Sequence, residues 1–582
     1  MKRLRKIALP ALFLSIALCS CVDDKYDLSD IDMTVGLQVN DLVVPVNIDE
    51  IKLETIFNLE GDGHVQVVDG EYVLLENGEF SSEGISIPEI IALAPYVEPI
   101  QIVLGESQNS ARKVKAYASA EQIELEIPRE TTSFNYEVEN VDKAVIDIES
   151  AKTDFEISLI LSIPELNSVL TGVNIKNLSF QLPKGLVIET NDGTYDASTG
   201  LFTVGDVRAE NNKIELAISA TELIFNESTA VFDGVSHTLN FEDELAINGG
   251  TLVIGLQDLK PGLTLLDVPA QFTLKVDYTL SDIEVKSFSG KVKYELDGLH
   301  VDPIHLEDLP SILNQEGTNI KLTNPQIYLT LNNPIARFKL KAQTGLSISS
   351  HFQNAEDRKY TLDENIVLGY DKGNDNYHFC LSPSQPAHYY EGYEDADHVL
   401  FSTLGDVLSG PRLPYALDID MLDAMVPEQT VEDFQLGVDL GDIHGKYTVY
   451  APFSFKGGSD VMYRETVDGW NSEELDNLVI KVLEVSGVVT SELPLEFDLY
   501  GHPIDKDGNI HEEVDIEGAR ILAEAKETPF TMRISGEISH LDGIEFLVMA
   551  IADDSGITLS PDLKIYLKDL KVKVSGNYVD EL

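Results

Sequence analysis

The feature that most constrains the fold is the alternation of apolar and polar residues along much of the chain. Runs such as Phe272–Tyr278, Gly290–Leu296 and Tyr447–Phe455 carry apolar side chains at about every second position, the periodicity of a β-strand with one buried face. Charges such as Lys291 and Lys293 occupy outward positions, which suits sheets with one solvated face. We therefore expect an all-β, mainly antiparallel fold of tandem β-sandwich-like domains.

Asp-Gly dipeptides between apolar runs predict tight hairpins. Asp69-Gly70 joins 65–68 to 71–74, Asp192-Gly193 is expected to join 187–189 to 201–204, and Asp507-Gly508 repeats the pattern. Helical signals are few and short, so only small helical inserts are expected. They fall at 88–94, 164–170, 305–313, 417–425 and 516–526.

Composition indicates a folded and strongly acidic body. Apolar residues make up 43% of the chain, with 22 Phe and 22 Tyr, which is typical of a globular protein rather than a disordered one. Cys380 is the only cysteine after residue 21, so no internal disulfide is expected. The formal net charge is −59, and without a clustered basic face this argues against a nucleic-acid partner.

The first twenty residues have the pattern of a signal peptide. Four basic residues among the first six precede an apolar core at 7–18. Twelve residues are too few to cross a bilayer, which takes about 20. Residues 1–20 are therefore predicted to be removed as an export signal rather than to span a membrane.

The end of this segment, Leu18-Cys19-Ser20-Cys21, resembles the lipobox of bacterial lipoproteins. The resemblance implies that Cys21 carries a diacylglycerol, becomes the new N-terminus after cleavage, and anchors the protein through acyl chains such as palmitate. Two or three such chains hold a protein firmly at a membrane. Cys19 is unusual at the spacer position, and an ordinary secretory signal with two incidental cysteines is the alternative.

The segment 21–33 is expected to be an acidic tether. Five aspartates crowd it, at positions 23, 24, 27, 30 and 32, and this patch resembles the surface-export signal of lipoproteins from Bacteroidota. Val22 follows the cysteine where an inner-membrane retention signal would have aspartate. The resemblance implies a lipid-anchored outer-membrane protein facing the cell exterior; an inward-facing one is the alternative, and the same composition also makes a solvated linker.

Three β domains are expected after the tether, at 34–170, 171–345 and 346–582. The third has an internal similarity to the second: Ile320–Leu329 resembles Ile557–Leu567 with one residue of slip, and basic alternating runs follow at 337–341 and 570–574. This suggests that the C-terminal domain duplicates part of the preceding one. Chance similarity between strands is the alternative.

Motifs of known enzyme classes are absent from the sequence. It contains no HExxH, phosphate-binding loop, Gly-x-Ser-x-Gly elbow or Cys-x-x-Cys. Thiol catalysis would rest on Cys380 alone. With 100 acidic residues, any carboxylate pair can be nominated for glycoside hydrolysis and none is distinguished. We therefore expect no enzyme, and a hydrolase with an unrecognised carboxylate site is the alternative.

One short segment matches part of a calcium loop. Asp505, Asp507 and Asn509 have the first, third and fifth ligand positions of an EF-hand. Ile510 and Ile516 then stand where glycine and glutamate are required. No resident cofactor is expected beyond the lipid, and an Asp-Gly turn is favoured over a weak calcium site.

The most distinctive local stretch is 375–398, which concentrates tyrosine, histidine and acidic residues. Tyrosine is enriched in binding interfaces because it offers rigid contact area at low entropic cost. Three roles are open: a loop whose aromatics plug the edge of a sandwich, a contact surface for a partner or glycan, or a zinc site. The candidate binding residues are Tyr377, His378, Tyr389, Tyr390, Tyr393 and His398.

The only tryptophan, Trp470, lies near Arg464. A partly exposed tryptophan beside an arginine makes an interface anchor, and a core position is the alternative.

Together the features of the sequence favour a non-catalytic cell-surface lipoprotein that acts as a binding or scaffold module, as a subunit associated with an outer-membrane protein complex. A glycan- or nutrient-binding lipoprotein is the second hypothesis.

Overall fold

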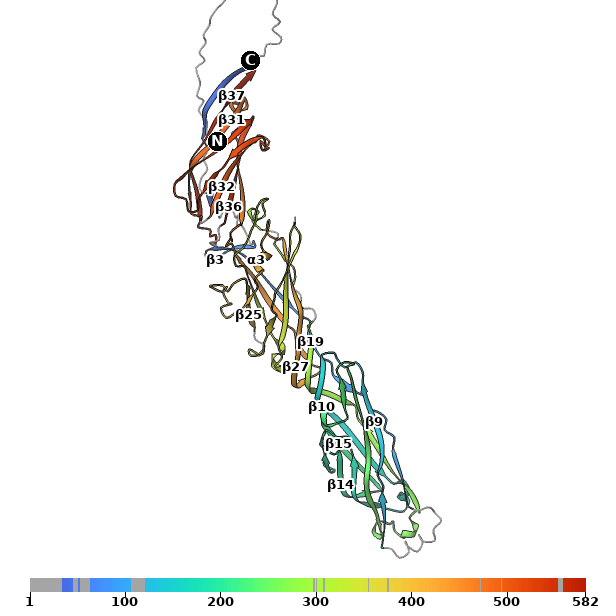
Figure 1. Cartoon of the computed structure of the whole chain (residues 1–582). Coiled ribbons are helices and arrows are strands. Elements are labelled where there is room, and N and C mark those ends of the chain that lie inside the picture. The colour runs from blue at the N-terminus through green and yellow to red at the C-terminus, as the bar shows by residue number, and fades with distance from the viewer. Residues whose placement is uncertain are drawn as a thin grey trace, which may run out of the picture. The chain divides into compact units, whose positions relative to one another are not determined.

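The computed structural model describes residues 34–45, 51–52, 63–105, 121–296, 299, 301–306, 309–353, 355–373, 376–470, 473–493, 495–552 and 558–581. The predicted signal peptide at 1–20, the lipidation site Cys21 and the tether at 21–33 lie outside these ranges and stay predictions. The regular secondary structure of the described chain is almost entirely β-strand, which confirms the all-β, mainly antiparallel class (Figure 1). Within the described ranges, no helix is both long and apolar enough to cross a membrane.

Contacts divide the chain into two compact units. Unit 1 combines the N-terminal part up to Ile51 with Tyr463–Ala550 and Lys564–Leu582, and unit 2 contains Lys52–Met462 and Ile551–Leu563. This grouping differs from three consecutive domains at 34–170, 171–345 and 346–582. Whether those ranges fold separately stays a prediction.

Unit 1 has two sheets whose inward side chains, such as Leu483, Met532 and Ile544, are buried. The first sheet contains β1 (Thr34–Pro45), β37 (Lys564–Glu581), β31 (Leu478–Ser491), β35 (Thr528–Ile538) and β33 (Val514–Glu517), with β2 (Ile51–Lys52) also on β37. The second contains β30 (Asp460–Val467), β36 (Leu541–Ile551), β32 (Glu496–Asp505) and β34 (Ala519–Ile521); α4 (Glu473–Asp476) precedes β31. Strand β1 runs antiparallel to β37, with Thr34 opposite Glu581.

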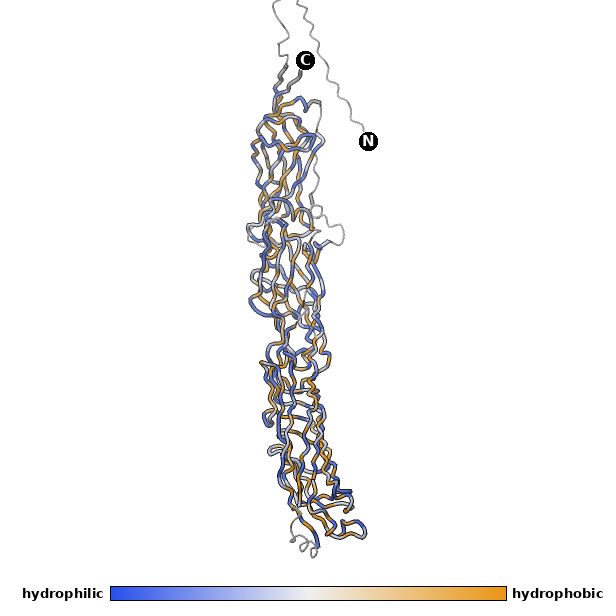
Figure 2. Tube along the Cα trace, turned by 90° about the vertical axis from the view of Figure 1, so that its right-hand side faces the viewer, coloured by the Kyte–Doolittle hydropathy of each residue, from blue (hydrophilic) through white to orange (hydrophobic). Residues whose placement is uncertain are grey.

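Unit 2 contains a first β-sandwich, in which Tyr136 and Phe155 meet edge to face in the core at 5.8 Å between ring centroids. One layer contains β12 (Leu186–Glu189), β15 (Lys213–Ile224), β10 (Val145–Ser162), β18 (Gln271–Leu280) and β7 (Ile100–Gly105). The other contains β13 (Thr194–Asp196), β14 (Leu201–Glu210), β11 (Gly172–Gln181), β17 (Thr238–Gly255), β8 (Gln122–Ile127) and β9 (Glu130–Val138), with β16 (Val231–Asp233) at the end of β17. Hydrophobic and hydrophilic residues alternate along these strands, as the sequence predicts (Figure 2).

The rest of unit 2 has a further layer and a six-stranded sheet. The layer contains β6 (Ile90–Ala92), β19 (Ile283–Glu295), β27 (Ala416–Gln435), β20 (Ile304–His305), β22 (Ala342–His351), β23 (Arg358–Thr361) and β24 (Ile366–Leu368). The six-stranded sheet, called the β21 sheet below, has the order β26 (Asp397–Leu400), β25 (Tyr377–Ser382), β21 (Gln326–Leu331), β29 (His444–Pro452), β4 (Glu71–Ser81) and β3 (Val65–Val68). β5 (Ile85–Ser86) pairs β28 (Asp439–Gly441).

Helical elements of unit 2 are single turns. They are η2 (Pro164–Ser168), η3 (Phe225–Glu227), η4 (Leu256–Asp258), η5 (Leu265–Asp267), η6 (Ser311–Asn314), η7 (Pro334–Phe338) and α3 (Leu404–Val407). The helical expectation at 164–170 is confirmed by η2, and the one at 305–313 is met only by the start of η6. Three other expectations are wrong, because 90–92, 417–425 and much of 516–526 are strands. At 417–425 the apolar spacing also fits a strand, and pairing mainly with β22 decides the outcome.

The hairpin predictions had mixed outcomes. Asp69-Gly70 forms the turn between β3 and β4, with both residues at positive φ, as a type I′ turn requires. The prediction of a hairpin around Asp192-Gly193 is wrong, because β12 and β14 do not pair with each other. Instead β12 pairs with β15, and β14 pairs with β11 and β13. Non-local sheet partners override the local turn signal there.

The proposed internal repeat is not matched along its full length. The run 570–574 lies in β37, but 337–341 begins in η7 and continues through Lys339 in the left-handed region, at φ 58°. Pro334 at the start of η7 favours this helical turn. The expected strand at 337–341 is therefore wrong, and whether the domains are duplicates stays a prediction.

A histidine ties the end of β22 to its neighbours. His351 Nδ1 lies 2.9 Å from Asp357 Oδ2, and its Nε2 lies 2.8 Å from Asp418 Oδ2. Hydrogen bonds to the two carboxylates raise the pKa of His351, and the histidine lowers the pKa of Asp357. The imidazolium form is the one that can donate to both carboxylates.

Candidate functional site

The register of the β21 sheet assembles a row of polar side chains from four strands. Thr330 on β21 lies opposite His378 on β25 and Lys446 on β29, and Lys446 lies opposite Glu79 on β4. Residues directly opposite in an antiparallel pair share a face of the sheet. We call this face of the β21 sheet the outer face. Lys446 and Glu79 are well exposed there, at 66% and 73% of their side chains.

The next row on the outer face is more enclosed. Tyr328 lies opposite Cys380 and Thr448, and Gln326 beyond it lies opposite Tyr450. The intervening side chains of these strands, such as Ile327, Leu329 and Val449, point to the other face and are buried. Strand β21 is nevertheless buried at all six positions, so its outer face must also be covered.

The cover is the segment 383–396 between β25 and β26, called the cover loop below. The rings of Tyr390 and Tyr393 lie 6.0 and 4.8 Å from that of Tyr328, and Tyr390 also lies 5.3 Å from Tyr450. The backbone N–H of Tyr390 donates to the Tyr328 hydroxyl at 3.0 Å. Four tyrosines thus form one cluster, called the tyrosine cluster below. Burial raises the pKa values of Tyr328 and Tyr450, so both phenols stay protonated at neutral pH.

A histidine–aspartate pair holds the other end of the cover loop. His378 Nδ1 lies 2.7 Å from Asp395 Oδ1, and this contact lowers the pKa of Asp395. The His378 ring lies 5.3 Å from that of Tyr393. Thr330 Oγ1 donates to the Tyr393 hydroxyl at 3.1 Å. The outer face therefore positions the cover loop through named polar contacts as well as ring packing.

Only part of the predicted binding set comes together. His378, Tyr390 and Tyr393 meet on the outer face. Tyr377 points to the opposite face and donates to Asp371 Oδ1 at 3.1 Å. The remaining two residues, Tyr389 and His398, contact Gln385 and Ser382 respectively.

Cys380 lies beneath the cover loop and is fully buried. Its thiol is 3.9 Å from Ser382 Oγ, and burial raises its pKa. A buried protonated thiol is a poor nucleophile. Cys380 is therefore part of the packing under the tyrosine cluster.

The open end of the outer face contains a hollow of about 510 Å³. Its polar lining comes from Glu79, Ser81, Thr330, Asn376, His444 and Lys446. Lys446 Nζ donates to Glu79 Oε1 at 2.6 Å, which lowers the pKa of Glu79 and raises that of Lys446. This size lies within the range of small-molecule sites, about 300–1,000 Å³.

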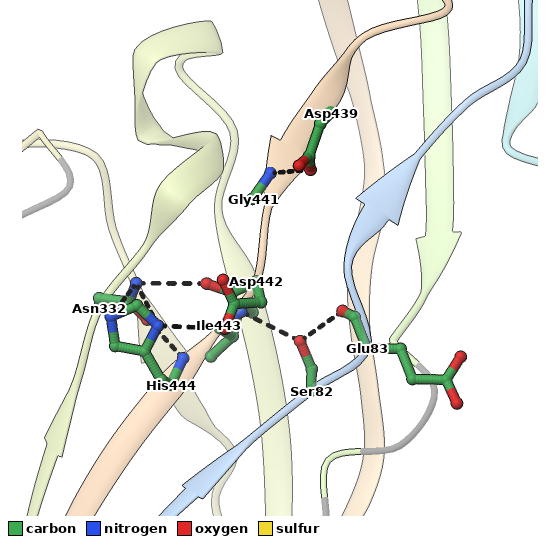
Figure 3. A network of polar contacts seen from close by, with 8 residues as sticks. All are labelled: Ser82, Glu83, Asn332, Asp439, Gly441, Asp442, Ile443 and His444. Carbon is green, nitrogen blue, oxygen red and sulfur yellow. Dashed lines mark hydrogen bonds and ion pairs between the residues drawn. The ribbon is translucent and has the colours of Figure 1, made fainter.

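A polar network fixes the strand ends beside this hollow (Figure 3). The backbone N–H of His444 donates to Asn332 Oδ1 at 2.7 Å, and Asn332 Nδ2 lies 3.1 Å from His444 Nε2. Asp442 Oδ2 lies 3.3 Å from His444 Nδ1. On the adjacent strand, Ser82 Oγ accepts from the Ile443 N–H at 3.0 Å. These contacts position the His444 ring beside the hollow.

Glycine at 445 keeps the strands close at this point. A Cβ there would lie 2.5 Å from a Phe80 ring carbon and 2.8 Å from a Leu331 methyl carbon. The missing side chain therefore lets the inner apolar residues pack directly under the hollow.

Most of the hollow and half of the tyrosine cluster could not be predicted from the sequence. Tyr328, Thr330, Tyr450 and Lys446 belong to alternating runs and read as ordinary outward strand residues. Alternation alone places Tyr328 and Thr330 on one face. It does not reveal that β29 and β4 lie beside them.

The other predicted sites lie in unit 1. Trp470 is partly exposed, and its backbone N–H donates to the Asp542 carbonyl at 2.7 Å. Arg464 forms an ion pair with Glu545 at 2.7 Å. Their role as an interface stays a prediction.

The weak calcium candidate has the geometry of a turn. Asp505 Oδ1 accepts the backbone N–H groups of Asp507 and Asn509, both at 2.9 Å. The Asn509 side-chain amide, together with these backbone groups, lowers the pKa of Asp505. The carboxylate is thus committed to its own backbone. Across the residues that the structure covers, no group of three or more His, Cys, Asp or Glu side chains is arranged to hold a metal ion.

Comparison with known proteins assigns no activity to this chain. No family model matches the chain, and no curated protein matches it. Among solved structures, it is similar to a predicted secreted protein from Parabacteroides distasonis, at 11% identity and a TM-score of 0.39, covering 92% of this chain and 99% of that one. A nodavirus structure from Penaeus vannamei matches at 10% identity and a TM-score of 0.11, over 45% of this chain and 84% of that one. Likenesses this distant carry no functional conclusion.

Proposed function

We propose that this chain is a non-catalytic lipoprotein of the outer-membrane surface that binds a partner or ligand through the outer face of the β21 sheet. The observation that carries this proposal is the tyrosine cluster under its cover loop, beside a preformed polar hollow. Ordered tyrosines and fixed polar groups make a surface suited to recognition, because little conformational entropy is lost on binding. The membrane placement rests on the lipobox at Cys21 and the acidic segment after it.

The anchor and the fold are compatible in length. Thr34, the first residue of β1, lies 13 positions after Cys21. An extended chain covers at most about 45 Å over that distance. Unit 1 therefore begins within about 45 Å of the lipid, whatever the conformation of the tether.

Binding is favoured over catalysis by the state of the reactive groups on the outer face. Glu79 is paired with Lys446, Asp395 with His378, and the Cys380 thiol is buried. General acid–base catalysis needs a group poised to exchange protons near the working pH. The carboxyl pKa values here are lowered, away from that range.

The placement is tested by labelling cells with a clickable palmitate analogue and by protease shaving of intact cells. The wild-type chain should be labelled and shaved, and Cys21→Ala should abolish both results. An unlabelled wild-type chain, or one that keeps residues 1–20 in the cytosol, contradicts the anchor.

The binding role is tested by mild crosslinking in cells followed by purification of the chain. We expect a membrane-protein partner that is lost in a Tyr390→Ala, Tyr393→Ala double variant. Tyr370→Ala is the matched control, because Tyr370 is an exposed tyrosine of unit 2 with no ring contact to the tyrosine cluster. Recovery of the same partner with the double variant contradicts this use of the outer face.

A further inference from the structure

The hollow at the open end of the outer face has a chemistry of its own. The strand register places Glu79, Thr330 and Lys446, and the network of Figure 3 positions His444. Asn376 directly precedes β25. These side chains include ammonium, imidazole, amide, hydroxyl and carboxylate groups. Hydrogen-bond donors and acceptors therefore line the same small space.

The charges in the hollow cancel locally. Among the described residues that line it, Glu79 and Lys446 alone carry a fixed formal charge, and they are bonded to each other. An anion would meet the field of a chain with net charge −59, and a cation would meet the Lys446 ammonium. The electrostatics therefore favour a neutral ligand.

The ion pair still has bonding capacity. Lysine has three N–H donors and a carboxylate has about four acceptor sites, and their mutual contact uses one of each. A bonded ammonium–carboxylate pair thus presents a donor and an acceptor side by side. Neighbouring hydroxyl groups, each of which donates and accepts, match this arrangement.

Thr330 links the hollow to an aromatic ring. Its side chain lines the hollow and donates to the hydroxyl of Tyr393, whose ring is only partly buried. Small-molecule sites commonly combine aromatic surface with a few placed polar groups. A ligand with a polyhydroxylated edge and an apolar ring face fits both features.

We infer that the hollow lined by Glu79, Thr330, Asn376, His444 and Lys446 binds a neutral saccharide. This inference rests on the proposed binding role of the outer face and names its ligand class. Lys446 and Glu79 bond adjacent hydroxyl groups, and Asn376 and His444 bond the opposite edge of the sugar. Tyr393 supplies the apolar surface at the side of the hollow.

The test uses the full mature chain purified in detergent, so that it does not depend on membrane placement. Saturation-transfer NMR and thermal shift are measured with maltose, cellobiose and lactose. Glucuronate serves as the anionic comparator and protonated glucosamine as the cationic one. We expect at least one neutral disaccharide to bind and the charged compounds to bind far more weakly.

Two variants locate the site. Lys446→Met and Asn376→Ala should each weaken binding about tenfold or more, as expected when a hydrogen bond involving a charged or well-placed group is lost. Lys481→Met is the matched control, because Lys481 forms a comparable exposed ion pair with Glu537 at 2.9 Å in unit 1. Circular dichroism confirms that each variant is folded.

Three outcomes overturn the inference: no binding of any neutral saccharide in the panel, equal binding of the charged comparators, or unchanged binding in folded Lys446→Met and Asn376→Ala. Failure of the proposed function has a different signature. If the proposed function is wrong, palmitate labelling is absent, or the same crosslinked partner is recovered with the Tyr390→Ala, Tyr393→Ala double variant. Saccharide binding is measured independently of both results.

Discussion

The ion pair between Arg208 and Asp258 provides the sharpest test of the packing of unit 2. The Asp258 side chain is 0% exposed; it accepts from Arg208 Nη1 at 2.6 Å and from the Gly255 N–H at 2.8 Å. It thereby ties β14 to the turn after β17. Arg208→Met leaves a buried carboxylate with the Gly255 N–H as its remaining donor among these contacts.

The magnitude follows from this burial. Removing one partner of a buried ion pair costs about 3–5 kcal/mol, because the remaining charge stays desolvated. Arg208 is 35% exposed, so water can reach part of the vacated space. We therefore expect Arg208→Met to lower the free energy of unfolding by about 3 kcal/mol, at the lower end of that range.

Guanidinium unfolding of the full chain, followed by circular dichroism, measures this loss. Hydrogen exchange of the β14 and β17 amides reports whether it is local. Lys213→Met is the control, because its exposed pair with Glu215 should contribute no more than about 0.5 kcal/mol. The double variant Arg208→Met, Asp258→Asn should recover much of the stability, since no charge is then buried. Equal losses for Arg208→Met and Lys213→Met would refute the reasoning.

Three further predictions follow from single residues. His351→Gln should destabilise the chain most at mildly acidic pH. Because the pKa of His351 is raised in the folded state, its contribution to the free energy of unfolding is complete below about pH 6.5, the ordinary value for histidine, and is lost as pH rises through the folded-state pKa. In thermal unfolding from pH 5 to about 9, the melting temperatures of wild type and variant should therefore converge as pH rises. Gly445→Ala should lower the free energy of unfolding by about 1–3 kcal/mol, because the added methyl group overpacks the sheet. Gly84→Ala, whose methyl group meets open space, should leave the free energy of unfolding nearly unchanged; guanidinium unfolding measures both. Cys380 should resist iodoacetamide in the folded mature chain and react only in denaturant, as mass spectrometry will show; rapid labelling of folded protein would contradict its burial.

Local sequence patterns predicted where the strands of this protein lie better than which strands pair with one another. The alternating runs at 272–278 and 290–295 are strands, and the Asp69-Gly70 hairpin is present. Both depend on interactions within a few residues. The segment 417–425 shows the limit of such reasoning, because its apolar spacing fits a helix and a strand equally well.

In the candidate site, too, local features could be predicted from the sequence and long-range contacts could not. Clustered tyrosines at 389–393 drew attention to the cover loop in the sequence. Tyr328 and Tyr450, which complete the tyrosine cluster, lie 57 or more residues away on either side. Lys446 meets Glu79 across 367 positions. No periodicity of the sequence encodes such a distance.

Four properties could be predicted from the residue order alone: the all-β class, the acidic character, a single cysteine after residue 21, and the candidate lipid anchor at Cys21. Each of these follows from composition or from residues close together in the chain. The folded structure adds the long-range arrangement: β1 pairs with β37, two compact units are assembled from separated segments, and the polar hollow is lined by β4, β21, β29 and Asn376. These features depend on which strand edges meet, and the outcome is set by the burial of apolar faces over the whole fold, a property that no local window of residues contains.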